Sequence, residues 1–146
     1  MLLVHELLTD IDAKMDYVPD IKNVSGVSKI NRVNSFHTCV FDDLEIHFVT
    51  LSNENKSREL NYTEEANLSI GVEFISDYKI KESSSGTNLE VRMFPKPKVI
   101  SNKSIIKKMF DGFKERIILM RIKSITKKNL VIFKNYCERI AIERRK

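Results

Sequence analysis

The chain has 146 residues, of which 42% are hydrophobic and 31% are charged, a composition that excludes an intrinsically disordered protein. Its apolar opening, MLLV, is followed at once by His5 and Glu6, unlike a secretory signal peptide. No stretch approaches the roughly 18 uninterrupted apolar residues of a membrane span. The sequence therefore predicts one cytoplasmic domain over residues 1–146, long enough to bury a core.

The formal charge of +5 is divided unevenly along the chain. Residues 1–98 hold 11 basic and 16 acidic residues, whereas residues 99–146 hold 14 basic and 4 acidic residues, a balance of +10. Such a cationic segment suits either a solvated face that attracts the acidic half or a phosphate-binding surface. The lysines and arginines spread around several helix faces without an aromatic platform, so the solvated face is favoured and nucleic acid is not the expected partner.

Two helical segments are expected at the start of the chain. Residues 2–14 have an apolar face at helical spacing, formed by Leu3, Val4, Leu7, Leu8 and Ile11. A second short turn is expected at residues 15–21, where Pro19 limits any helix that crosses it. The sequence thus predicts a broken helical pair.

A β-hairpin is predicted around Asp42-Asp43, because residues 33–41 and 44–51 alternate between apolar and polar on both sides of this turn. If the two aspartates form the loop, three residue pairs face one another on the buried side: Phe41 and Leu44, Cys39 and Ile46, and His37 and Phe48. The hairpin register is therefore a specific expectation.

Three more strands are predicted at residues 58–63, at residues 67–80 and from Thr87 to the Pro95-Lys96-Pro97 segment, with a turn at residues 82–86. Leu60 and Tyr62 point inward in the first of them. The second has one long inward row, formed by Leu68, Ile70, Val72, Phe74, Ser76, Tyr78 and Ile80. Together the strands predict an antiparallel meander with one solvent-facing side.

A long helix is expected from Lys103 to about Glu143, capped by Ser101 or Asn102 and weakest at Gly112. Residues 117–120 are apolar nearly all round, so this turn is expected to be enclosed on more than one side. They belong to a broad apolar stripe that comprises Ile105, Ile106, Met109, Phe110, Phe113, Ile117, Met120, Ile122, Ile125, Leu130, Phe133, Tyr136 and Ile140.

The order of these elements resembles the START-like superfamily, also called SRPBCC or Bet v 1-like, which includes polyketide cyclase-related proteins. Short motifs carry the likeness: Leu7-Leu8-Thr9-Asp10, the segment from Tyr17 to Lys22, Phe36-His37-Thr38-Cys39, Gly86-Thr87, and the closing helix from Leu130 to Glu138. The resemblance implies an α+β helix-grip fold, in which a curved antiparallel sheet wraps around a long C-terminal helix and leaves a cavity between them.

Two departures from the family pattern stand out. Members usually begin with a strand ahead of the helical pair, whereas here a helix is expected almost from Met1, and Asn34 replaces a glycine before the His-x-Cys strand. A missing first strand would leave an unpaired sheet edge, which a second copy of the chain can fill. The sequence therefore predicts a homodimer through this edge.

Eight residues are the predicted contacts for a hydrophobic small molecule: His37, Cys39, Tyr62, Phe74, Tyr78, Phe113, Ile117 and Met120. The alternative is that Tyr62, Tyr78 and His37, together with Tyr136, are hydrogen-bonded core aromatics. His37 and Cys39 share a strand face, but a zinc site needs more ligands and nucleophilic catalysis needs a group that orients the base. No catalytic residue, metal or cofactor is expected, and Cys39 and Cys137 are predicted to be free thiols.

Three functions are consistent with these features. The leading one is the binding or carrying of a lipid-like or aromatic molecule between the sheet and the last helix. The second is a cyclase or aromatase-like enzyme with His37 as its titratable group. The third is a protein or nucleic-acid interaction module that uses a sheet edge or the basic helix.

Overall fold

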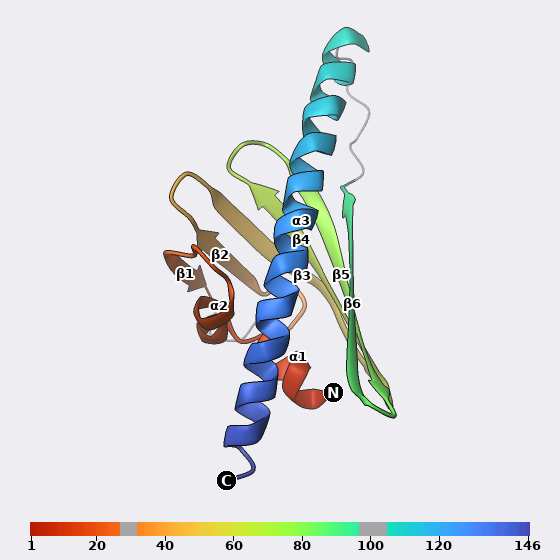
Figure 1. Cartoon of the computed structure of the whole chain (residues 1–146). Helices are drawn as coiled ribbons and strands as arrows, with labels where there is room; N and C mark the ends of the chain where they lie inside the picture. Colours follow the sequence, from red (N-terminus) through yellow and green to blue (C-terminus); the bar gives the residue numbers. More distant parts are fainter. Residues whose placement is uncertain (27–31, 97–104) are drawn as a thin grey trace.

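The computed structural model describes residues 1–26, 32–96 and 105–146, and the side chains of the last range from Gly112 onward. Within these ranges, a curved antiparallel sheet of six strands packs on one face against two short N-terminal helices and one long C-terminal helix (Figure 1). The elements are α1 (Leu2–Leu8), α2 (Ile11–Tyr17), β1 (Asn23–Gly26), β2 (Phe36–Val40), β3 (Glu45–Lys56), β4 (Glu59–Leu68), β5 (Glu73–Ser83), β6 (Gly86–Pro95) and α3 (Ile105–Glu143). The predicted α+β helix-grip arrangement is confirmed.

The helical pair is broken earlier than predicted. The expected helix over 2–14 ends at Leu8, and Asp10 caps a second helix by accepting a hydrogen bond from the Asp12 amide at 3.0 Å. The hydroxyl of Thr9 donates a hydrogen bond to the carbonyl of His5 at 2.9 Å, so one of the backbone carbonyls at the C-terminal end of α1 has a partner. An aspartate that caps a new helix competes with helix continuation, which explains the break.

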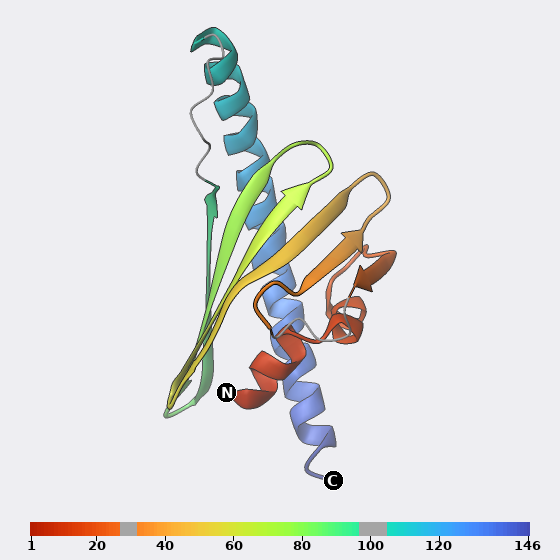
Figure 2. The same cartoon turned by 180° about the vertical axis from the view of Figure 1, so that it is seen from behind.

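The sheet is a meander in which each strand pairs with the next along the chain, in the order β1 to β6 (Figure 2). The predicted hairpin register is confirmed, because Cys39 pairs with Ile46 and His37 pairs with Phe48. The Phe41 amide donates to the Leu44 carbonyl at 2.8 Å and closes the loop around the two aspartates. Side chains alternate between the two faces of a strand, and the short turn fixes how the two strands pair. These two features were sufficient to predict which side chains lie opposite one another.

The single strand predicted over residues 67–80 is wrong. The chain reverses after Leu68, and Gly71 takes a φ of 80° in the turn before β5 begins at Glu73. The Leu68 amide bonds to the Val72 carbonyl at 2.9 Å across this turn, and both side chains are buried. Ile70, predicted to face inward, is exposed in this turn. The alternation resumes in phase at Val72, so it does not by itself reveal the reversal.

Strand β1 was not predicted, because only Val24 among its four residues is apolar. Gly26, with a φ of 134°, allows close pairing with β2: a Cβ atom there would lie 2.5 Å from the Phe36 carbonyl oxygen and 2.7 Å from the His37 Cα. Strands β1 and β6 are the edges of the described sheet. A homodimer through such an edge stays a prediction.

Helix α3 crosses the concave face of the sheet and projects beyond it (Figures 1 and 2). It continues through Gly112, and the predicted caps Ser101 and Asn102 lie outside the described residues. Two core clusters hold it to the sheet. One contains Ile118, Leu119 and Ile122 against β3, β4, β5 and β6, and the other contains Phe133, Tyr136, Cys137 and Ile140 against α1, α2 and the sheet.

The apolar stripe predicted on this helix is too broad. Phe113 and Met120 are 65% and 63% exposed, and Ile125 is exposed as well. The turn 117–120 buries Leu119 but not Met120, so it is enclosed on one side and the expectation of a fuller enclosure is wrong. Of the helices in the described ranges, none has both the length and the apolar character that crossing a bilayer requires.

Candidate functional site

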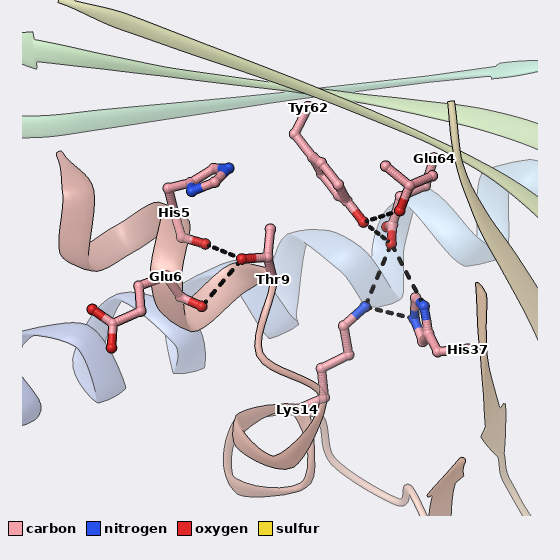
Figure 3. A network of polar contacts seen from close by, with 8 residues as sticks. His5, Glu6, Thr9, Lys14, His37, Tyr62 and Glu64 are labelled. Atoms are coloured by element: carbon pink, nitrogen blue, oxygen red, sulfur yellow. Dashed lines mark hydrogen bonds and ion pairs between the residues drawn. The ribbon is translucent and has the colours of Figure 1, made fainter. Parts of the chain in front are cut away.

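Five polar side chains meet on the inner side of the sheet, and we call them the buried polar cluster. Lys14 comes from α2, His37 from β2, Thr50 from β3, and Tyr62 and Glu64 from β4. All five are buried. Figure 3 shows Lys14, His37, Tyr62 and Glu64 pointing toward one another.

Glu64 and Lys14 are the charged centre of the cluster. The Lys14 Nζ donates to His37 Nε2 at 2.8 Å and lies 3.7 Å from Glu64 Oε1. The Tyr62 hydroxyl donates to the same Oε1 at 2.5 Å, and the Thr50 and Tyr62 hydroxyls are 3.2 Å apart. An ammonium group has no lone pair, so His37 Nε2 is the acceptor and its ring proton sits on Nδ1, 3.9 Å from Glu64 Oε1.

Burial and the neighbouring Lys14 ammonium lower the pKa of His37 to about 2, so the imidazole is neutral at physiological pH. Burial, followed by the Glu64 carboxylate, raises the pKa of Tyr62 and keeps its phenol protonated. Burial also raises the pKa of Cys39. The cluster therefore contains one buried ion pair, surrounded by neutral donors and acceptors.

This arrangement is better suited to joining elements than to acid–base chemistry. The Nε2 lone pair of His37 is occupied by Lys14, and neither His37 nor Tyr62 titrates near neutral pH. The ring of His37 also stacks on Phe48, with centroids 4.7 Å apart. We conclude that the cluster fixes α2 onto β2 and β4 by a desolvated ion pair whose hydrogen-bonding groups are largely satisfied.

The neutral state of His37 predicts a specific dependence of stability on pH. The unfolded chain binds a proton at His37 near pH 6.5 and the folded chain does not, so stability is complete above that pH and falls as the pH decreases toward 2. Between about pH 6 and pH 4, we expect wild type to lose up to ~1.4 kcal/mol of unfolding free energy per pH unit more than His37→Gln. Urea denaturation at a series of pH values measures this difference.

The matched control is His47→Gln, which changes an exposed histidine on the neighbouring strand. It should retain the wild-type dependence on pH. Parallel curves for wild type and His37→Gln would contradict the neutral, buried imidazole.

The structure separates the eight predicted ligand contacts. His37, Cys39, Tyr62 and Phe74 are buried in the sheet, and Tyr78, whose ring centroid is 5.6 Å from that of Tyr62, is partly buried. On α3, Ile117 is half-buried, while Phe113 and Met120 are exposed. Cys39 and Cys137 are free and buried. Among the described residues, no three His, Cys, Asp or Glu side chains are grouped as metal ligands.

Sequence reasoning missed Lys14 and Glu64. Glu64 was overlooked because the strand was predicted to end at Thr63, although Glu64 continues the inward row of Leu60 and Tyr62. Lys14 lies three residues from both Ile11 and Tyr17, on the buried face of α2. Both residues could have been found in the sequence, because each is a charged residue at a position where the pattern of its element predicts a buried apolar side chain.

A second feature is an open groove of about 480 Å³ between β6 and α3. Val91, Arg92 and Met93 line it from the strand, and Lys123, Thr126, Lys127 and Leu130 line it from the helix. These helix residues lie between the two core clusters, which hold α3 at residues 118–122 and 133–140. None of the eight predicted ligand contacts lines this groove.

No family model matches the chain, and comparisons with curated proteins and with solved structures found no match either. The START-like resemblance therefore stays a prediction.

Proposed function

We propose that the protein binds, and thereby carries, a hydrophobic small molecule between its sheet and its C-terminal helix. The observation that carries this proposal is the groove between β6 and α3. Its volume of about 480 Å³ falls in the range of roughly 300–1,000 Å³ that is usual for small-molecule sites.

The lining of the groove supports an apolar occupant. Val91 and Met93 come from the strand and Leu130 comes from the helix, so apolar side chains contribute from both sides. All three are only half-buried. An apolar molecule in the groove would remove part of this surface from water, which is the usual driving force for such binding.

The buried polar cluster supports the same assignment indirectly. Its ion pair and hydrogen bonds fix α2 to the sheet, so it supplies a rigid scaffold. The groove lies beside the edge strand β6 and contains none of the cluster residues, and it is open to solvent. A binding function therefore needs no rearrangement of the cluster.

The proposal is tested with Nile red, a neutral apolar dye, by fluorescence titration and by native mass spectrometry for stoichiometry. We expect one dye per chain, and Leu130→Gln should weaken binding about tenfold, because it replaces an apolar contact by a polar one. The matched control is Val131→Gln, the same kind of change at an exposed neighbouring position of α3. Equal binding by the two variants, or no binding by wild type, would overturn the proposal.

A further inference from the structure

The groove between β6 and α3 is basic as well as apolar. Lys123 and Lys127 lie four residues apart on α3, so their ammonium groups occupy one face of the helix. Arg92 adds a third cation from β6, with its Nε 2.7 Å from Glu90 Oε1. The lining residues thus include three cations and no carboxylate, so the lining has a net positive charge.

The two lysines have no ion pair with any carboxylate in the described ranges of the chain. Two like charges at this helical spacing repel each other and destabilise the helix slightly. By contrast, Lys134 on the same helix lies 3.8 Å from Glu138. An anion between Lys123 and Lys127 would convert this repulsion into two attractive contacts, and the hydroxyl of Thr126, which also lines the groove, is a further donor.

We infer that the occupant of the groove is an amphiphile, in which an apolar tail is attached to a single carboxylate or phosphate head group. The tail lies along Val91, Met93 and Leu130, and the head group binds Lys123 and Lys127. This inference rests on the proposed function and specifies its ligand class. The basic lining of the groove and the anionic head group are complementary in charge.

The test compares three ligands that share one tail: decanoate, decyl phosphate and decanol. Isothermal titration calorimetry is performed below their critical micelle and solubility limits. We expect either anion to bind about tenfold more tightly than decanol, because hydrogen bonds between charged groups add to the apolar contact. The preference should shrink as the salt concentration rises. The anion that binds more tightly identifies the head group.

Lys123→Gln/Lys127→Gln should lower the affinity for the preferred anion about tenfold and leave decanol binding nearly unchanged. The control, Lys128→Gln/Lys134→Gln, makes the same change of charge at exposed positions of α3 outside the groove and should behave like wild type. Circular dichroism establishes that both variants are folded.

The outcomes separate the two proposals. If decanol binds as tightly as both anions, the head-group inference is overturned while the proposed function stands. If none of the three ligands binds, the head-group inference is overturned, and the Nile red titration decides the proposed function. If the anions bind more tightly but the two double variants respond alike, the assignment to Lys123 and Lys127 is overturned.

Discussion

Glu64→Gln should lower the free energy of unfolding by about 3–5 kcal/mol, the cost of removing one partner from a buried ion pair. The substitution leaves the Lys14 ammonium, 3.7 Å away, desolvated and without its counter-charge. The Gln amide oxygen still accepts a hydrogen bond from Tyr62, so the loss comes mainly from the charge. Urea denaturation followed by circular dichroism measures it.

Two further variants make this result specific. Glu54→Gln removes an exposed carboxylate that pairs with Lys56 on the surface, and it should cost less than about 1 kcal/mol. Lys14→Met/Glu64→Gln removes both charges and should regain much of the lost stability, because replacing a whole buried pair is often neutral. A Glu64→Gln protein as stable as Glu54→Gln would contradict the buried ion pair.

Phe133→Ala should cost about 3–5 kcal/mol of unfolding free energy, the range for truncating a buried phenylalanine. Phe133 is 3% exposed, and its ring centroid lies 4.5 Å from that of Tyr17. The side chain thus joins α3 to α2, and its loss leaves a cavity in the core. Thermal and urea denaturation both report the change.

Phe113→Ala is the matched control on the same helix. Phe113 is 65% exposed, so its truncation should change the free energy of unfolding by less than about 0.5 kcal/mol. The pair of variants tests which face of α3 packs on the sheet. Similar costs for the two substitutions would show that the helix is rotated from the orientation described.

The parts of the fold that depend on short sequence patterns could be predicted. In the β2–β3 hairpin, strict alternation on both sides of Asp42-Asp43 determined that His37 faces Phe48 and Cys39 faces Ile46. The long helix followed from an uninterrupted run of helix-forming residues. These features depend on neighbours in the sequence, and the structure confirms them.

Other features depend on contacts between distant segments. The reversal after Leu68 was hidden because Leu68 and Val72 are both inward on either side of the turn. Strand β1 is held by pairing with β2 and by the close approach at Gly26, and it has almost no apolar pattern of its own. Such pairing cannot be read from four mainly polar residues.

The candidate site was predicted only in part. His37 and Tyr62 were recognised as inward polar side chains, but their partners Lys14 and Glu64 come from separate elements that only the fold brings together. On α3 the sequence shows a broad apolar stripe, and the sheet determines which part of it is covered. The groove likewise combines residues about 30 positions apart, from β6 and α3.

The central claim is that a small amphiphilic molecule binds between β6 and α3. The most direct measurement is a titration of isotope-labelled protein with decanoate, followed by amide chemical shifts in NMR. The account predicts saturable shifts at residues 91–93 and 123–130, with little change at His37 and Tyr62. Shifts centred on the buried polar cluster, or no saturable shifts at any residue, would contradict it.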